Sequence, residues 1–185
     1  MYKNFNEIYH FIHQFKEYDL IKLDRKISLI YRNYDKKINI NLIKKIRNFC
    51  KITKRKFYLA NNVKLGYNLN LDGVYIPAFN KCLKHNSFGG KKNFKILGSA
   101  HNIKEIRIKE KQKVDKIFIS PIFKNKKKEK FLGIHRFLIL KRMTTKKVIA
   151  LGGINKSTIG KLRLVKCDGF ASISLIKTLY NENRR

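Results

Sequence analysis

Two short segments toward the C-terminal end of the chain carry residue types that suit a bound anion. In VIALGGIN, four apolar residues run directly into Gly152 and Gly153, and the segment DGFASIS ends on Ile173 and Ser174. Glycine lacks a Cβ, so backbone N–H groups at such a pair can approach an oxyanion closely. A tight turn between a strand and a helix needs the same glycines, but the pairing of the two segments favours a phosphate site.

A histidine and further polar residues follow other segments that have the character of strands. His101 comes two residues after Ser99 in LGSAH. Imidazole gains and loses a proton near neutral pH, so His101 is suited to proton transfer. The alternative is a buried histidine that makes only a structural hydrogen bond. Other strand ends supply Arg32 and Asn61, and the whole set is polar, basic and almost free of acid, which suits a phosphorylated ligand.

These residues need a scaffold that brings several strand ends together, and the periodicity of the sequence predicts one. Short β-rich segments alternate with helical patterns, which is typical of parallel strands joined by crossover helices. The predicted strands span residues 9–15, 27–32, 56–60, 73–76, 94–98, 116–120, 147–151 and 169–173. Helical patterns cover residues 39–52, 101–112, 135–143 and 155–165, with Asn102 and Asn155 as N-caps.

Eight such units predict an α/β fold, a compact (β/α)8 TIM barrel that forms a single domain over residues 1–185. The chain is short for this fold, and we expect the helices after Ile76 and Ser174 to be reduced. An open doubly wound sheet is the competing architecture, but it favours a glycine-rich turn after the first strand, which is missing here. Barrels of this kind bind ligands at the C-terminal strand ends, often with phosphate after strands seven and eight.

The net charge of +32, from 44 Lys and Arg against 12 Asp and Glu, admits two interpretations. Clustered basic residues bind nucleic acids by releasing counterions from the phosphate backbone. However, 34 of the 44 basic residues are lysine, and asparagine and isoleucine are abundant too, which indicates a composition bias. Because the lysines are scattered and arginine is the better phosphate fork, we expect no specific nucleic-acid partner.

The remaining composition indicates a reduced, cytoplasmic, globular protein. Hydrophobic residues make up 43% of the chain, close to the value of ordinary globular domains. Cys50, Cys82 and Cys167 form no CxxC pair, so we expect neither a disulfide framework nor a zinc site. No apolar segment approaches the roughly 20 residues that a membrane span needs, and MYKNFNEIYHF lacks the layout of a secretory signal.

Several segments, taken in order, resemble the successive motifs of the thiamine phosphate synthase/TenI superfamily. They are ISLIYRNY, FYLANN, LDGVYI, LGSAHNIKEI, DKIFISPIFKNKKK, VIALGGINKSTIGKL and DGFASIS. The resemblance implies a (β/α)8 barrel with a role in thiamine biosynthesis. It also implies that a thiazole phosphate, the small phosphorylated substrate, is held at Gly152, Gly153, Ile173 and Ser174.

The superfamily contains two activities. The synthase joins an aminopyrimidine pyrophosphate to a thiazole phosphate with the help of Mg²⁺. The TenI type isomerises a thiazole phosphate to its aromatic form by a proton shift, and the resemblance implies that His101 is the proton shuttle, although synthases often carry the same SAH segment. It further implies substrate contacts at Arg32, Asn61, Ser99 and Lys128, the last matching a phosphate-contacting lysine.

Departures from the synthase pattern favour the TenI type. The synthase holds Mg²⁺ through two aspartates, and Asn62 and Asn80 stand in their places here. Mg²⁺ is a hard cation held by carboxylates and phosphates, so neutral amides are poor replacements. Pro77 also resembles the TenI type. We therefore expect a tautomerase that uses His101 and no metal.

Two alternatives to the tautomerase remain. An active synthase, which would need Mg²⁺, is the first of them. A degenerate member of the superfamily that only binds phosphorylated ligands or nucleic acid is the second, and it predicts an affinity that falls steeply with salt.

Overall fold

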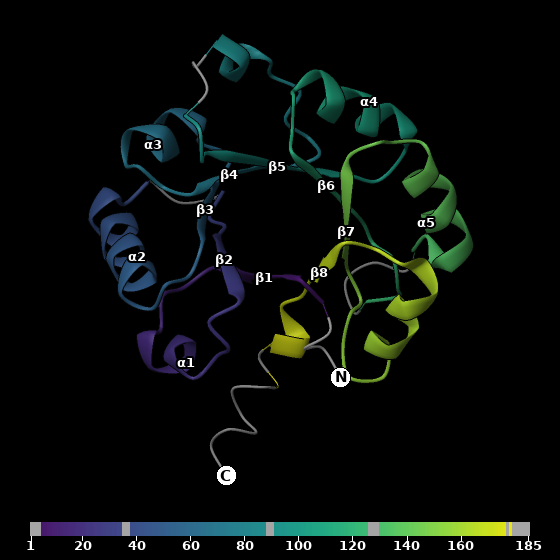
Figure 1. Ribbon diagram of the computed structural model, residues 1–185, viewed down its shortest axis with the longest axis horizontal. Helices are drawn as coiled ribbons and strands as arrows, with labels where there is room; N and C mark the ends of the chain where they lie inside the picture. Colours follow the sequence, from purple (N-terminus) through teal and green to yellow (C-terminus); the bar gives the residue numbers. More distant parts are fainter. Residues whose placement is uncertain (1–4, 35–37, 88–90, 126–129, 177, 179–185) are drawn as a thin grey trace.

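Eight parallel strands close into a barrel in the computed structural model, which describes residues 5–34, 38–87, 91–125, 130–176 and 178. Each strand pairs with its neighbours in chain order, and β8 pairs with β1. Figure 1 looks down this ring, with the helices on its outer side. The predicted (β/α)8 barrel is confirmed, and the open doubly wound sheet is excluded.

The elements alternate along the chain as the sequence predicts. The strands are β1 (Glu7–Ile12), β2 (Ile27–Tyr31), β3 (Phe57–Ala60), β4 (Gly73–Ile76), β5 (Lys95–Ala100), β6 (Lys116–Ile119), β7 (Lys147–Leu151) and β8 (Gly169–Ala171). The α-helices are α1 (Glu17–Ile21), α2 (Ile40–Ile52), α3 (Val63–Asn68), α4 (Ile103–Lys111) and α5 (Gly133–Arg142), and the 3₁₀-helices are η1 (Lys84–Ser87) and η2 (Ile159–Val165).

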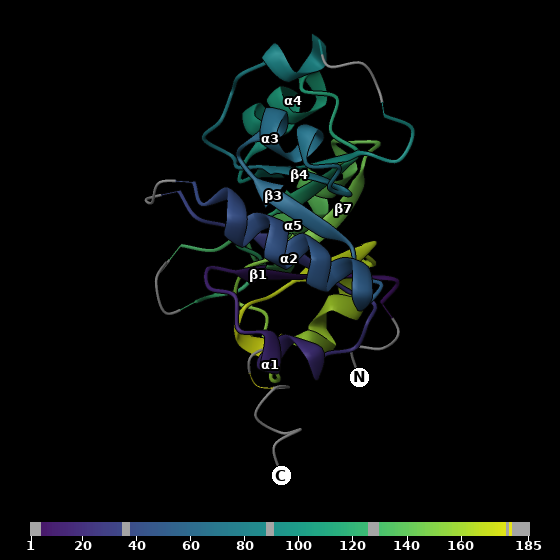
Figure 2. The same ribbon diagram turned by 90° about the vertical axis from the view of Figure 1, so that its left-hand side faces the viewer.

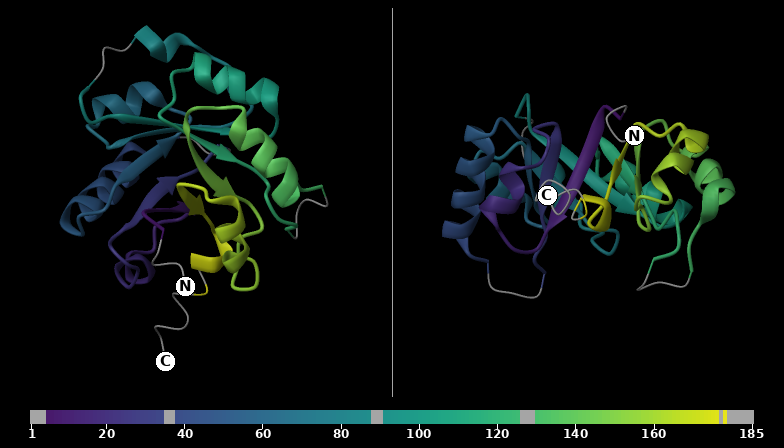
Figure 3. Two further views of the ribbon diagram at one scale, coloured as in Figure 1. Left: turned by 45° about the vertical axis from the view of Figure 1, so that its right-hand side comes forward. Right: turned by 90° about the horizontal axis from the view of Figure 1, so that it is seen from below.

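The helices surround the barrel as a second layer. Figure 2 shows α2 and α3 in front of the strands on one side, and Figure 3 shows α2 and α5 on opposite sides of the barrel. Helix α2 begins at Asn39, whose side chain accepts a hydrogen bond from the amide of Leu42, and it buries Ile43, Ile46 and Phe49 against the strands. None of the helices in the described ranges has the length and apolar character that a membrane span requires.

The barrel has two separate apolar layers. Its interior is strongly aromatic: Tyr75 packs edge-on against Phe11 and Phe118, with ring centroids 5.1 and 5.4 Å apart. The layer between strands and helices is mainly aliphatic and contains Ile27, Leu29 and many similar side chains. Because successive residues of a strand point to opposite faces, each strand contributes to both layers.

Two sequence predictions about local structure are wrong. The first strand spans Glu7–Ile12 rather than 9–15, since His13 leaves the sheet and bonds through Nδ1 to the carbonyl of Arg32. The segment 155–165 is not an α-helix capped by Asn155. The side chain of Asn155 instead accepts hydrogen bonds from the amides of Ser157 and Thr158, and this local turn is followed by the 3₁₀-helix η2.

The barrel is shortened where the sequence indicates. Between β4 and β5 the described residues contain only η1, and no α-helix. The N-cap prediction for Asn102 is confirmed, because its side chain accepts a hydrogen bond from the amide of Glu105 at the start of α4. This cap matters for function because it lies directly after His101.

Candidate functional site

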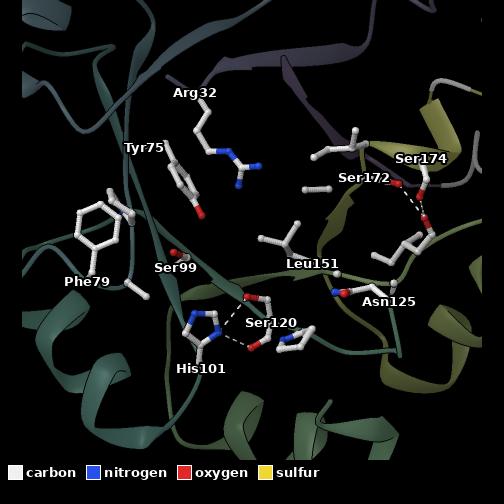
Figure 4. A pocket seen from close by; sticks show the side chains of 18 of the residues that line it. Arg32, Tyr75, Phe79, Ser99, His101, Ser120, Asn125, Leu151, Ser172 and Ser174 are labelled. Carbon is white, nitrogen blue, oxygen red and sulfur yellow. Dashed lines mark hydrogen bonds between the residues drawn. The ribbon is translucent and has the colours of Figure 1, made fainter. Parts of the chain in front are cut away.

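A cavity of about 690 Å³ opens at the C-terminal ends of the strands. Seven of the residues that the sequence predicts for the site line it, namely Arg32, Ser99, His101, Gly152, Gly153, Ile173 and Ser174. Figure 4 shows the labelled side chains around this space, with His101 and Ser174 on opposite sides. Tyr75 also lines the cavity, so the aromatic interior of the barrel closes it from below.

His101 is held in place by the first turn of α4. The carboxylate of Glu105 accepts hydrogen bonds from the backbone amide of His101 at 2.6 Å and from the side chain of Asn102 at 3.2 Å. Asn102 in turn caps the amide of Glu105 at 3.0 Å. This reciprocal arrangement is a variant of the capping box, and it fixes the backbone from which the imidazole projects.

The imidazole ring of His101 is oriented by Ser120, at the end of β6. Nδ1 lies 2.7 Å from the carbonyl oxygen of Ser120 and 3.2 Å from its hydroxyl oxygen. A carbonyl oxygen only accepts, so Nδ1 carries a proton in this contact, and in the neutral imidazole Nε2 is then the nitrogen with the lone pair. Nε2 faces the cavity, and no described residue bonds to it (Figure 4). The protein therefore orients the imidazole ring and leaves its Nε2 able to act as a base.

The glycine pair forms a turn that lies tightly against the loop after β6. Both glycines have positive φ, +93° at Gly152 and +70° at Gly153. A Cβ on Gly152 would come within 2.7 Å of Pro121, and a Cβ on Gly153 would overlap the carbonyl group of Phe123. The need for a tight turn is thus real, and the bare backbone also faces the cavity.

The turns after β7 and β8 are tied together through one carbonyl group. The hydroxyls of Ser172 and Ser174 both donate to the carbonyl of Ile154, at 2.7 and 3.2 Å (Figure 4). These hydroxyls are therefore engaged within the protein. Within the described part of the chain, no acceptor bonds to the amides of Gly153, Ile173 or Ser174. Gly153, Ile173 and Ser174 all line the cavity, so their backbone N–H groups are candidate donors to a phosphate there.

Arg32 brings a positive charge to the cavity. Its guanidinium group lies over the ring of Phe11, 5.1 Å from the centroid, and Nη2 lies 3.0 Å from Nε2 of His13. Since Nδ1 of His13 donates to the Arg32 carbonyl, Nε2 accepts from the guanidinium. Below it, burial raises the pKa of Tyr75 to about 12, an effect that a hydrogen bond with Ser99 and the charge of Arg32 partly oppose. The Tyr75 phenol is therefore neutral at physiological pH.

The asparagines at the metal positions of the synthase are engaged elsewhere. Asn62 caps α3, accepting from the amide of Leu65 at 3.0 Å. Asn80 donates to the side chain of Asn61 at 2.6 Å and accepts from the amide of Cys82 at 2.8 Å. Neither residue offers a carboxylate, so this donor set does not fit Mg²⁺. The described residues contain no group of three His, Cys, Asp or Glu that could hold a metal.

Two predicted substrate contacts are not part of this cavity as described. Asn61 lines a neighbouring cavity of about 290 Å³ together with Asn33, Asn62 and Tyr34. Its role as a substrate contact stays a prediction. Lys128 lies outside the described residues.

Ser120 and His13 shape the site but were not predicted to belong to it. Ser120 acts through its backbone carbonyl, which any residue could supply. His13 accepts a hydrogen bond from the guanidinium of Arg32 and so holds it in place. Phe79 and Tyr34 pack edge-on at the rim, with ring centroids 5.4 Å apart, and both line the cavity. The capping motif Asn102 to Glu105 was the one detectable signal, because its spacing is that of a capping box.

Two curated proteins similar to this chain are thiamine-phosphate synthases. A thiamine-phosphate synthase of Prochlorococcus marinus is 30% identical over 143 residues, which are 72% of this chain and 39% of that protein. One of Koribacter versatilis is 31% identical over 90 residues, 47% of this chain and 41% of that protein. The matches thus span about two fifths of the length of these relatives.

Solved structures agree on the fold. A thiamine phosphate pyrophosphorylase from Pyrococcus furiosus superposes with a TM-score of 0.73 at 17% identity, covering 97% of this chain and 94% of that one. The corresponding protein from Bacteroides thetaiotaomicron gives 0.60 at 16% identity, covering 91% and 82%. The family model for thiamine monophosphate synthase (TMP-TENI) matches residues 16–176. With this match over most of its length, the chain belongs to the thiamine phosphate synthase/TenI family of thiamine biosynthesis.

Proposed function

We propose that this protein binds a thiazole phosphate in the cavity and converts it to the aromatic tautomer, with His101 moving the proton. The observation that carries the proposal is the contact of His101 Nδ1 with the carbonyl of Ser120, which leaves Nε2 as an unspent base at the cavity wall. A base with a fixed tautomer and direction is what a proton shift between two carbons needs.

The opposite side of the cavity suits the phosphate group. The amides of Gly153, Ile173 and Ser174 lie in two turns that are held together by Ile154, so the donors are preorganised. Donors that need no rearrangement bind a charged group at lower cost than flexible side chains do. The phosphate would bind at this end, and the ring would reach across the cavity toward His101.

The middle of the cavity suits an uncharged ring. Leu151 and Ala171 line it together with the neutral phenol of Tyr75. In this arrangement Nε2 takes a proton from the non-aromatic ring and, as imidazolium, returns a proton where the aromatic form carries it. The reaction leaves the atoms of the substrate unchanged and gains its driving force from aromaticity.

An active synthase is the second candidate, favoured because both curated relatives named above are thiamine-phosphate synthases. Arg32 in the cavity would also suit a pyrophosphate. Against it stand Asn62 and Asn80, whose side-chain oxygens accept hydrogen bonds from backbone amides and carry no charge.

Assays with the purified protein separate the two candidates. The tautomerase predicts conversion of the non-aromatic thiazole phosphate, followed by absorbance, at a rate that EDTA leaves unchanged. The synthase predicts release of pyrophosphate when both substrates and Mg²⁺ are present. Mg²⁺-dependent pyrophosphate release without tautomer conversion would overturn our proposal in favour of the synthase, and failure to bind thiazole phosphate at all would reject both.

A further inference from the structure

A lysine outside the cavity holds one wall of its mouth. Lys109 of α4 is fully buried, which is uncommon for lysine. Its Nζ donates three hydrogen bonds of 2.8 Å, to the carbonyls of Pro77 and Asn80 and to the side-chain oxygen of Gln112. All three partners are neutral, so the contacts saturate the donors of the ammonium group without an ion pair.

The barrel leaves room for this side chain at one strand. Gly98 of β5 lies beneath it, and a Cβ there would come within 2.8 Å of Cδ of Lys109. The aliphatic part of Lys109 thus runs across the outer face of β5 toward the loop after β4. A buried ammonium is costly to desolvate, so its retention calls for a specific role in this arrangement.

The loop that Lys109 holds is the one that forms the rim. Pro77, Ala78 and Phe79 line the cavity, and the amide of Asn80 closes the turn onto the carbonyl of Pro77 at 3.1 Å. Gln112 adds two hydrogen bonds to the same segment, to the carbonyls of Asn80 and Cys82 at 3.0 and 2.9 Å. The loop is therefore fastened to α4 on its outer side.

On its inner side the same loop presents Phe79. The ring is 64% exposed and contacts Tyr34 of the loop after β2, and the Asn80 side chain bonds Asn61 of the loop after β3. One fastened turn thus fixes the relative places of three strand-end loops. Its apolar face lies at the cavity, where a planar ring would enter.

We propose that Lys109 is a positioning residue of the cavity mouth, which fixes the turn from Pro77 to Asn80 and thereby holds Phe79 as the wall against which the ring of the ligand rests. The ligand part of this inference rests on the proposed function. The positioning of the loop does not depend on it.

The first arm of the test needs no ligand. Lys109→Met removes the three hydrogen bonds at similar length, and Lys104→Met changes an exposed lysine of the same helix as a control. We expect amide hydrogen exchange in residues 77–83 to become about tenfold faster or more in Lys109→Met, with β6 and β7 unchanged and the control equal to wild type. Unchanged exchange in this segment would overturn the positioning role.

The second arm measures affinity for thiazole phosphate by calorimetry. We expect Lys109→Met and Phe79→Ala each to weaken binding by about five- to tenfold, and the double variant to bind no worse than the weaker single variant, because both changes remove the same wall. Additive losses would show that Lys109 does not act through Phe79. If wild-type protein does not bind thiazole phosphate, the proposed function fails and the exchange experiment alone decides the role of Lys109.

Folding is controlled with a second substitution. Lys109→Gln keeps an amide donor, so exchange in residues 77–83 should fall between wild type and Lys109→Met. If both variants fail to fold while Lys104→Met folds, Lys109 serves global stability, and its role as a positioning residue is rejected.

Discussion

The two halves of the cavity mouth differ in what their polar groups do. After β3 and β4, the side chains of Asn61, Asn62 and Asn80 bond one another or cap the backbone. After β5, β7 and β8, Nε2 of His101 and the backbone amides of Gly153, Ile173 and Ser174 have no hydrogen-bond partner among the described residues, and these four residues line the cavity. The polar side chains after β3 and β4 thus make hydrogen bonds within the protein, whereas the polar groups after β5, β7 and β8 can contact a ligand.

This contrast separates two kinds of chemistry that share one barrel. Binding of Mg²⁺ depends on side-chain carboxylates, and a substitution to asparagine replaces a carboxylate with a neutral amide of similar shape. A cradle of backbone amides depends on the shape of two turns, which glycine and packing maintain. A phosphate site of this kind therefore does not depend on the residues that a metal site needs.

The largest effect should come from a change at His101, after β5, and it should fall on the rate of tautomer conversion. His101→Ala removes the base, so we expect tautomer conversion to fall by about 100- to 10,000-fold while the affinity for thiazole phosphate changes little. The matched control is Ser120→Ala, which keeps the carbonyl that accepts from Nδ1 and should retain activity within a few-fold. Equal conversion by His101→Ala and wild type, measured by absorbance, would break the assignment.

A change to the glycine turn after β7 should lower the stability of the protein. Gly153→Ala places a Cβ against the carbonyl of Phe123 at a positive φ, so we expect the free energy of unfolding to fall by about 2–4 kcal/mol. Gly160→Ala is the control, because a Cβ there meets no atom within 4 Å. Urea denaturation measures the free energy of unfolding of both variants. If Gly153→Ala left the free energy of unfolding unchanged, the turn would be able to open without cost.

Lys109, which holds the loop after β4, should make the stability of the protein depend on pH. Burial lowers the pKa of Lys109 to about 8 from 10.5, opposed by the charge of Glu105. Between these values the unfolded chain binds more protons than the folded protein, so stability rises with pH in this window. We expect wild type to gain about 1–2 kcal/mol relative to Lys109→Met between pH 7.5 and 9.5 in urea denaturation. Parallel curves for the two proteins would contradict the lowered pKa.

The smallest effect concerns Asn62. Asn62→Ala should cost about 1 kcal/mol of stability because it removes the cap of α3, whereas Asn62→Asp should change stability by less than about 0.5 kcal/mol, since aspartate also caps. Neither change should alter affinity for thiazole phosphate. Calorimetric titration of Asn62→Asp with Mg²⁺ should show no binding, and tight binding would mean that the two halves differ less than we infer.

The sequence predicts the barrel well because its periodicity is redundant. Eight apolar segments of the right length each support the same architecture, so an error at one end, as in residues 9–15, does not change the result. The helix expected at 155–165 failed for a local reason: Asn155, Ser157 and Thr158 satisfy backbone groups in a turn and compete with the helix.

The site was predictable only where function depends on residue type. Glycine and histidine at strand ends are visible in a sequence, and Gly152, Gly153 and His101 do meet at one cavity. The carbonyl of Ser120 and the ammonium of Lys109 act over tertiary distances, through backbone partners that carry no sequence signature. Asn62 could be read as a lost metal ligand, but its role as a cap required the structure.

The shortness of β8 has a consequence for how a bound phosphate would stabilise the barrel. β8 contributes three residues to the sheet, and its partner β1 comes from the other end of the chain. Contacts between residues so far apart in the sequence have a high loop-closure cost, so we expect this seam to close late in refolding. Pairing of β8 with β7 brings the turn with Ile173 and Ser174 beside the turn with Gly153. A phosphate that bridges the two turns would stabilise, by mass action, the forms of the protein in which β8 is paired with β7.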